Sequence, residues 1–130
     1  MGARTLVTGG AGFVGSNLVN QLLAAGENVT VFDALLRPGA AHNVAWLQSH
    51  PQSFRLRLVR ADVRDFGAVQ AVVRDADIIY HLAGQVAVTT SVTDPRSDFD
   101  INALGTLNVL EAARVAAHRP VIVFTSTNKV

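Results

Sequence analysis

Cysteine is absent from this 130-residue sequence, and Tyr80 and Lys129 are the only residues of their kinds. Without cysteine the chain has neither a disulfide framework nor a thiolate zinc site, which fits a reducing compartment. Charge of one sign is missing as well, because eleven basic and ten acidic residues give a formal net charge of +1. Nothing in that balance favours binding to nucleic acid or to an anionic membrane.

Long hydrophobic runs are also missing. No stretch approaches the roughly 18 consecutive apolar residues of a membrane-spanning helix. The first residues lead into a strand-like run without the apolar region and cleavage site of a signal peptide. The composition, 49% hydrophobic and 16% charged, is that of a globular domain. We therefore expect a cytoplasmic protein that binds neither nucleic acid nor membrane.

Short apolar runs alternate with helical stretches, which is the pattern of repeated strand–helix–strand units. Strand-like runs occupy residues 5–8, 29–32, 54–59, 78–82 and 121–125. Helical spacing or capping residues mark 13–25, a short segment near 44–47, a segment opened by Asp65, and a long segment from Asp94-Pro95 to about residue 117. The pattern predicts one α/β domain over residues 1–130, a doubly wound (Rossmann) parallel sheet of about five strands in order 3-2-1-4-5. Such sheets bind ligands at the carboxyl ends of their strands.

The turn after the first strand carries the strongest chemical signal. Residues 8–15 read Thr-Gly-Gly-Ala-Gly-Phe-Val-Gly, with Gly-x-x-Gly-x-x-Gly spacing at Gly9, Gly12 and Gly15 and Gly-x-Gly-x-x-Gly spacing from Gly10. Glycine permits the tight turn, lets a pyrophosphate approach the backbone at Gly12, and lets the helix pack closely on the strand at Gly15. The free N–H groups and the dipole at the helix start then hold the phosphate charge.

Asp33 completes this pattern at the end of the second strand, 18 residues beyond Gly15. A carboxylate there accepts hydrogen bonds from ribose hydroxyls and repels a 2′-phosphate, so the pattern favours NAD over NADP. Arg37 softens that preference if it faces the cofactor and is otherwise solvated. Two alternatives stay open, an ordinary turn with a solvated Asp33 and a methyltransferase with a similar turn and acid. A P-loop is excluded, because Gly-Lys-Ser/Thr is absent.

Four segments together resemble the extended short-chain dehydrogenase/reductases, the family of nucleotide-sugar epimerases and dehydratases. They are residues 8–15, Asp62-Val63, residues 81–84 (His-Leu-Ala-Gly) and residues 125–130. Residues 83–114 and 126–130 are more narrowly similar to the CDP-paratose 2-epimerase (tyvelose epimerase) subfamily. The resemblance implies the NAD-binding part of an epimerase that oxidises a sugar carbon transiently and returns the hydride. It also implies a nucleotide-sugar substrate, with a CDP-hexose favoured, and a homo-oligomer.

The resemblance also assigns cofactor contacts to individual residues. Backbone N–H groups of Phe13 and Val14 would bind the pyrophosphate, and Asp62 and Val63 would bracket the adenine. Further cofactor contacts would come from Leu82, Ala83, Gly84, Asn102 and Ser126. Two alternative roles remain, a cap of the next helix for Asp62 and a hydrogen bond to nearby backbone for Asn102.

Thr127 matches the position of the family's catalytic Ser/Thr, which hydrogen-bonds the sugar oxygen undergoing oxidation. Thr89, Thr90 and Ser91 follow the fourth strand on the expected substrate side, where the alternative role is loop capping. His81 lies within an apolar strand and is interpreted as a core residue without a catalytic role. No spacing of the remaining histidines suggests a metal site.

The family's Tyr-x-x-x-Lys base motif is missing from these 130 residues. Gly84 stands four residues after Tyr80, and Thr125 four residues before Lys129. We therefore expect an N-terminal part that ends before the remaining strands and the substrate domain, is inactive alone, and exposes its fifth strand as a sheet edge prone to association. A dehydratase or reductase of the same family and a non-catalytic NAD-binding module are the alternative functions.

Overall fold

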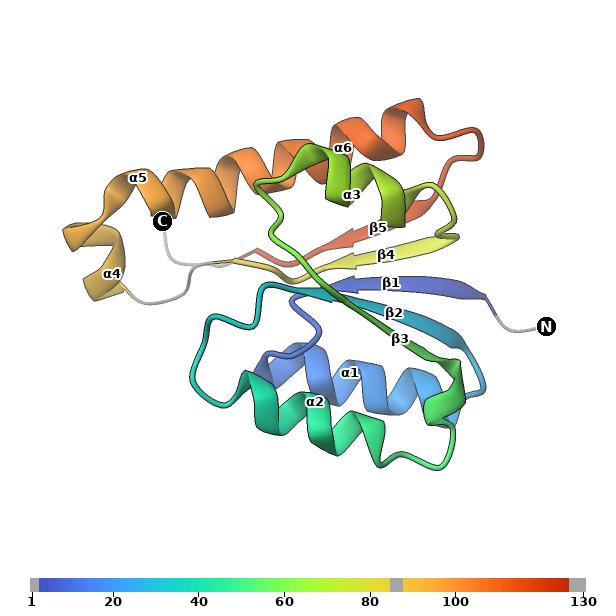
Figure 1. Cartoon of the computed structure of the whole chain (residues 1–130). Coiled ribbons are helices and arrows are strands. Elements are labelled where there is room, and N and C mark those ends of the chain that lie inside the picture. The colour runs from blue at the N-terminus through green and yellow to red at the C-terminus, as the bar shows by residue number, and fades with distance from the viewer. Residues whose placement is uncertain (1–2, 85–87, 127–130) are drawn as a thin grey trace.

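A five-stranded parallel sheet runs through the middle of the molecule (Figure 1). The computed structural model describes residues 3–84 and 88–126. The strands lie in the order β3-β2-β1-β4-β5. Their bounds are β1 Arg4–Thr8, β2 Asn28–Asp33, β3 Leu56–Arg60, β4 Ile78–His81 and β5 Val121–Phe124. This order confirms the doubly wound Rossmann sheet, with its switch point between β1 and β4.

Helices cover both faces of the sheet, as Figure 1 shows. α1 (Phe13–Ala24) and α2 (Ala40–Gln48) lie on one face, and α3 (Phe66–Val73) and α6 (Gly105–Val115) on the other. The shorter elements are a 3₁₀ turn at Ser53–Arg55, α4 (Val88–Thr93), α5 (Pro95–Phe99) and a π turn at Asp100–Leu104. Among the described residues no helix has the length and apolar character needed to cross a membrane.

β1 shows how strand alternation builds a core on each face. Leu6 packs with residues of α3 and α6, whereas Val7 packs with residues of α1 and α2. Thr5 and Thr8 are buried beside them, so β1 is covered on both sides, as the centre of a parallel sheet requires. The loop that follows Thr8 therefore leaves the sheet from a well-packed point.

The segment from residue 94 to 117 differs from the single helix predicted. Asp94 caps its start, accepting a hydrogen bond from the Ser97 N–H at 3.2 Å, but the helix changes to π geometry at Asp100–Leu104. After this turn the Gly105 backbone lies against Val63, whose Cγ2 would be 2.7 Å from a Cβ at position 105. The helix ends at Val115, because Ala116 takes an extended conformation. The third strand also begins later than expected, after the 3₁₀ turn.

β5 is one edge of the sheet, because β4 is the only strand of the described residues that pairs with it. Val121, Val123 and Phe124 are exposed on this strand, and Leu107 and Leu110 are exposed on α6. An unpaired apolar strand offers its backbone groups to another chain. The exposed edge expected from the sequence is thus present.

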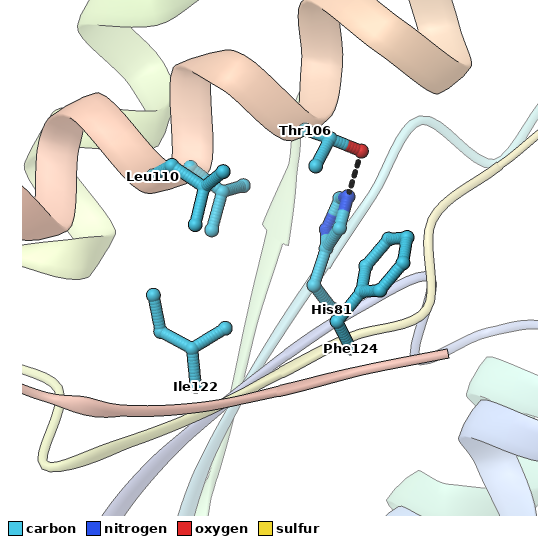
Figure 2. Close-up of a pocket in the computed structure, with 6 residues that line it drawn as sticks. His81, Thr106, Leu110, Ile122 and Phe124 are labelled. Carbon is cyan, nitrogen blue, oxygen red and sulfur yellow. Dashed lines mark hydrogen bonds between the residues drawn. The ribbon is translucent and has the colours of Figure 1, made fainter. Parts of the chain in front are cut away.

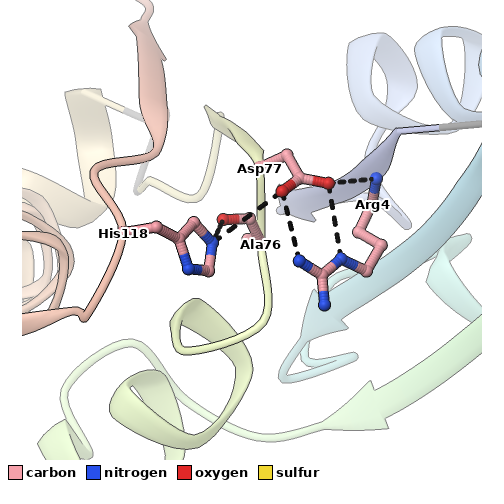
Figure 3. A network of polar contacts seen from close by, with 4 residues as sticks. All are labelled: Arg4, Ala76, Asp77 and His118. Carbon is pink, nitrogen blue, oxygen red and sulfur yellow. Dashed lines mark hydrogen bonds and ion pairs between the residues drawn. The ribbon is translucent and has the colours of Figure 1, made fainter.

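A polar network connects the amino-terminal ends of the strands (Figure 3). Asp77, before β4, accepts a hydrogen bond from the Arg4 N–H at 2.9 Å and from the Arg4 guanidinium at 3.3 and 3.4 Å. His118 donates from Nε2 to the Ala76 carbonyl at 2.8 Å, and lies 3.8 Å from the Asp77 carboxylate. The hydrogen bond from the Arg4 side chain lowers the pKa of Asp77 below its ordinary value.

Replacing Asp77 with Asn is expected to reduce the loss of stability at acid pH. Because its pKa is lowered in the folded chain, ionised Asp77 stabilises the fold above the unfolded-state pKa of about 3.9. That contribution disappears as the pH falls through the lower folded-state pKa. Urea midpoints measured between pH 7 and pH 3 check this, with exposed Asp75→Asn as control. Equal acid sensitivity of Asp77→Asn and the unchanged chain would contradict it.

Candidate functional site

A cleft of about 500 Å³ opens at the carboxyl ends of the strands. The loops after β1, β2, β3 and β4 all contribute to its walls. Eleven of the cofactor-binding residues predicted from the sequence line it, namely Gly9, Gly12, Phe13, Val14, Gly15, Asp33, Asp62, Val63, Leu82, Ala83 and Gly84. Arg37, which the sequence left as either solvated or cofactor-facing, also lines it. The lining residues not predicted from the sequence are Phe32, Ala34, Leu36, Pro38, Ala61, Ile101 and Thr125.

Three glycines of the loop after β1 are required for different reasons. Gly9 has φ of +72°, and a Cβ there would lie 2.8 Å from the Ala83 nitrogen. A Cβ at Gly15 would overlap the Gly9 carbonyl oxygen, so the start of α1 packs directly on the loop. At Gly12 a Cβ would approach only the Gly9 oxygen, at 3.3 Å, which leaves the cleft side of the backbone open to a ligand.

The start of α1 faces the cleft without a side-chain cap. Gly12 is the N-cap residue and forms no side-chain hydrogen bond, and the first turn contains no acidic residue. The first N–H groups of a helix have no acceptor within it, and the helix dipole adds positive potential. Phe13 and Val14 expose 82% and 63% of their surface there. This helix start is suited to bind an anionic group.

Asp33 connects the glycine loop to the end of β2. Its Oδ2 accepts a hydrogen bond from the Ala11 N–H at 3.0 Å, and its Oδ1 accepts one from the Leu35 N–H at 2.8 Å. Asn43 of α2 donates to the Ala11 carbonyl at 2.7 Å, so Ala11 is bonded on both sides. Each carboxylate oxygen has about two acceptor sites, which leaves one on each for a ligand hydroxyl.

Asp62 and Val63 form the wall beyond β3. Arg64 donates from Nη2 to Asp62 Oδ2 at 2.7 Å and from Nε to Oδ1 at 3.0 Å, and these bonds lower the pKa of Asp62. Asn108 of α6, which is buried, donates to the Val63 carbonyl at 2.8 Å. The alternative role for Asp62 as a helix cap is wrong, because Asp65 caps α3 by accepting from the Ala68 N–H at 3.2 Å.

Leu82, Ala83 and Gly84 line the cleft after β4. The Gly84 carbonyl accepts a hydrogen bond from Arg37 Nη2 at 2.9 Å. Arg37 therefore joins the loop after β2 to the loop after β4, whereas the sequence alone indicated either a solvated side chain or a cofactor contact. Its position in the cleft wall keeps a positive charge beside any anionic ligand.

Asn102 and Ser126 do not line the cleft. The Asn102 amide donates to Asp98 Oδ1 at 3.1 Å, and its Oδ1 would lie 3.1 Å from a Cβ on Gly84, so it adjoins the cleft wall from behind. Ser126 is exposed beyond β5.

The predicted substrate residues lie apart from the cleft lining as well. Thr89, Thr90 and Ser91 belong to α4, where the Thr89 and Thr90 carbonyls accept hydrogen bonds from the Thr93 hydroxyl at 3.1 and 3.3 Å. Thr127, the predicted catalytic residue, lies outside the described residues. Within the described part of the chain no cluster of His, Asp and Glu is arranged to hold a metal ion.

Residues 6–130 match the profile of the family described as GDP-mannose 4,6-dehydratase. The chain belongs to this family. Over 129 residues it is 44% identical to CDP-paratose 2-epimerase from Salmonella typhi, an alignment that covers 98% of this chain and 37% of that protein. The resemblance to nucleotide-sugar epimerases and dehydratases is thereby confirmed.

Solved structures of the family share the fold. A UDP-glucose-4-epimerase from Stenotrophomonas maltophila, with bound NAD and formylated UDP-arabinopyranose, superposes with a TM-score of 0.85 at 30% identity over 98% of this chain and 38% of that one. A dTDP-glucose 4,6-dehydratase from Streptomyces venezuelae, with NAD and TYD bound, superposes with a TM-score of 0.75 at 38% identity. That match covers 85% of this chain and 35% of the dehydratase. The chain thus spans little more than a third of these relatives.

Asn108 is the structural residue of this site that sequence reasoning missed. It lies on the buried face of α6, three residues after Gly105 and four before Ala112, all of which are buried. A polar residue at helical spacing among buried positions must find a partner. That spacing was the available signal, although it does not indicate which carbonyl accepts the bond.

Gly15→Ala is expected to destabilise the chain by about 1–3 kcal/mol, because the added methyl overlaps the Gly9 carbonyl and forces the loop to move. Gly67→Ala is the matched control in α3, where a Cβ meets only Asp65 Oδ1 at 3.6 Å. The control should be neutral or stabilising by up to about 1 kcal/mol. Urea unfolding measures both variants, and equal changes in unfolding free energy would contradict the packing assigned to Gly15.

Proposed function

We propose that this chain is the NAD-binding part of a nucleotide-sugar epimerase. One observation carries the proposal: the uncapped start of α1 and the fixed carboxylate of Asp33 line the same cleft, with Gly12 between them open to a ligand. A helix start suits a pyrophosphate, and a carboxylate with free acceptor sites suits a ribose diol.

The residues present fit NAD in chemical type. Phe13 and Val14 would donate backbone N–H groups to the pyrophosphate, and Asp33 would accept from the adenosine ribose. Asp62, held by Arg64, would accept from the adenine amine while Val63 packs on the ring. Leu82, Ala83 and Gly84 would lie along the nicotinamide half, where small side chains admit the ribose. Asn102 and Ser126 do not line the cleft and would contact the cofactor only from behind Gly84 and from beyond β5.

The proposed reaction is redox-neutral. NAD, when bound, supplies a hydride acceptor that returns the same hydride. This chain's part is to bind and orient it, and Thr127 would hydrogen-bond the sugar oxygen that is oxidised. Thr89, Thr90 and Ser91 would hydrogen-bond the hexose. Because the Tyr-x-x-x-Lys base motif is absent from these 130 residues, the chain by itself is expected to be inactive. A cytoplasmic location is part of the proposal.

A CDP-linked hexose epimerised at C2 is the favoured substrate, supported by the 44% identity to the Salmonella typhi protein. A 4,6-dehydratase is the alternative enzyme, supported by the likeness to the Streptomyces venezuelae structure. Asn128 and Lys129 follow Thr127, so the acidic pair expected of a dehydratase is not there. A non-catalytic NAD-binding module is the other alternative. It would use the same cleft, so only a measurement of activity distinguishes it from the two enzymes.

Asp33→Asn is expected to weaken NAD binding about tenfold or more and to reduce discrimination against NADP. The substitution removes the charge that strengthens hydrogen bonds to the ribose and that repels a 2′-phosphate. One amide oxygen remains to accept a backbone N–H. Calorimetric titration with both dinucleotides measures the effect. Asp77→Asn changes the net charge equally at the opposite end of the sheet and should leave both affinities unchanged; a similar loss in this control would contradict the assignment.

A chimera tests the proposed reaction. This chain would replace the aligned first part of the Salmonella typhi CDP-paratose 2-epimerase, which supplies the remaining length. Epimerisation of CDP-paratose is expected, and the same chimera carrying Asp33→Asn should lose most of it through weaker NAD binding. A folded chimera that binds NAD but yields no epimer would contradict the epimerase proposal and leave the dinucleotide site standing.

We further propose that the chain self-associates through the exposed β5 edge, where Val121, Val123 and Phe124 are uncovered. Pairing of two such edges would satisfy backbone groups and bury these side chains. Sedimentation should give a mean mass that rises with concentration. A single monomer boundary that does not change with concentration would rule this association out.

A further inference from the structure

His81 occupies a buried position behind the cleft. It ends β4 with 2% of its surface exposed, between β1 and α6. Its ring lines an apolar cavity of about 260 Å³. Leu110, Ile122 and Phe124 line the same cavity, and Phe124 is drawn beside the ring in Figure 2. The Phe124 ring stacks on it at a centroid distance of 6.2 Å. The proposed binding of the dinucleotide leaves this residue without a role.

The hydrogen bonds of His81 have one consistent direction. Thr106 Oγ1 lies 2.6 Å from the Asn102 carbonyl, which can only accept, so the hydroxyl proton points there. Toward His81 Nε2, at 3.0 Å, Thr106 must therefore accept, and Nε2 carries the proton. In a neutral imidazole Nδ1 is then the acceptor, and it receives the Thr8 hydroxyl at 2.7 Å.

Thr8 continues the same chain of hydrogen bonds to the cleft. Its Oγ1 accepts from the backbone N–H groups of Leu82 and Ala83, each at 3.1 Å. The Leu82 N–H is shared with the Thr8 carbonyl, also at 3.1 Å. Leu82 and Ala83 line the cleft, whereas Thr8 and Thr106 do not. One directed sequence therefore runs from the Leu82 and Ala83 amides through Thr8, His81 and Thr106 to the Asn102 carbonyl in the π turn.

The environment keeps the imidazole neutral, as this sequence requires. Burial lowers the pKa of His81 below its ordinary value. The described groups that face it are uncharged on every packed element: Thr8 on β1, Thr106 on α6 and Phe124 on β5. A protonated ring would place a second N–H toward Thr8 and leave the Thr8 hydroxyl proton without an acceptor.

We propose that His81 is a positioning residue of the NAD cleft, because its imidazole joins the Leu82 and Ala83 amides to the π-turn carbonyl of Asn102 in one directed hydrogen-bond chain. The chain sets the path of the backbone that leads to Gly84, beside which Asn102 Oδ1 lies. It therefore fixes the nicotinamide side of the cleft from behind. The effect on cofactor affinity rests on the proposed function; the proton arrangement does not.

Nitrogen-15 NMR of the imidazole in the unliganded 130-residue chain tests the arrangement directly. The expected result is a protonated Nε2 and an unprotonated Nδ1 at pH 7, with Leu82 and Ala83 amide resonances that respond when the ring titrates below its ordinary pKa of about 6.5. A proton found on Nδ1 would overturn the proposal.

Threonine variants test the positioning role. Thr106→Val removes the hydroxyl but keeps the shape, and should weaken NAD binding about three- to tenfold although the side chain does not touch the cleft. Thr106→Ser restores the hydroxyl and should recover most of the affinity. Thr5→Val is the control, because Thr5 is a buried threonine of β1 whose hydroxyl donates to Glu27 at 2.8 Å, away from His81.

The outcomes separate the two proposals. If Thr106→Val weakens binding no more than Thr5→Val at a similar loss of unfolding free energy, His81 has no positioning role. If the unchanged chain does not bind NAD while Nε2 is protonated and Thr106→Val shifts the Leu82 and Ala83 amides, the proposed function fails for this chain and the hydrogen-bond chain is upheld.

Discussion

The hydrogen bonds around Ala11 hold the cleft together. Its N–H donates to Asp33 at the end of β2, and its carbonyl accepts from Asn43 of α2. These bonds fix the loop between β1 and α1, and this loop positions the first N–H groups of α1. The close packing of this loop requires glycine at positions 9 and 15. A side chain at Gly9 would overlap the backbone of Leu82 and Ala83, and one at Gly15 would overlap the Gly9 backbone. The same carboxylate that would receive the ribose therefore also orders the loop that would receive the phosphates.

The two ends of the sheet are organised differently by the parallel arrangement. At the amino-terminal ends, Arg4, Asp77 and His118 pair with each other and with backbone. At the carboxyl ends, the glycine loop presents backbone donors without a side-chain cap, and Asp33 has acceptor capacity to spare. Polar groups that are hydrogen-bonded within the protein stabilise the fold, whereas polar groups with spare donors or acceptors are available to a ligand. We therefore place the proposed ligand site at the carboxyl end, where open α/β sheets bind their ligands.

The glycine loop, Asp33 and the Asp65 cap were predictable from the sequence, because each depends on local spacing. The strand order was predictable because repeated strand–helix–strand units have right-handed crossovers and form a doubly wound sheet. Periods of two and of about 3.6 residues mark strands and helices, and glycine and capping residues mark their ends. The π turn at Asp100–Leu104 was not predictable from residue spacing, and neither was the contact of the following Gly105 backbone with Val63. The bonds from Arg37 to Gly84 and from Asn108 to Val63 span 47 and 45 residues. Sequence spacing carries no information about such contacts.

The central claim is that this cleft binds a dinucleotide between the start of α1 and the loop after β4. It is tested most directly by an amide NMR titration with NAD. Saturable shifts are predicted at Phe13 and Val14 of α1 and at Leu82, Ala83 and Gly84 after β4. Arg4 and Asp77, at the opposite strand ends, should not shift. Saturable shifts confined to the β5 edge, or no shifts in a folded chain, would contradict the account.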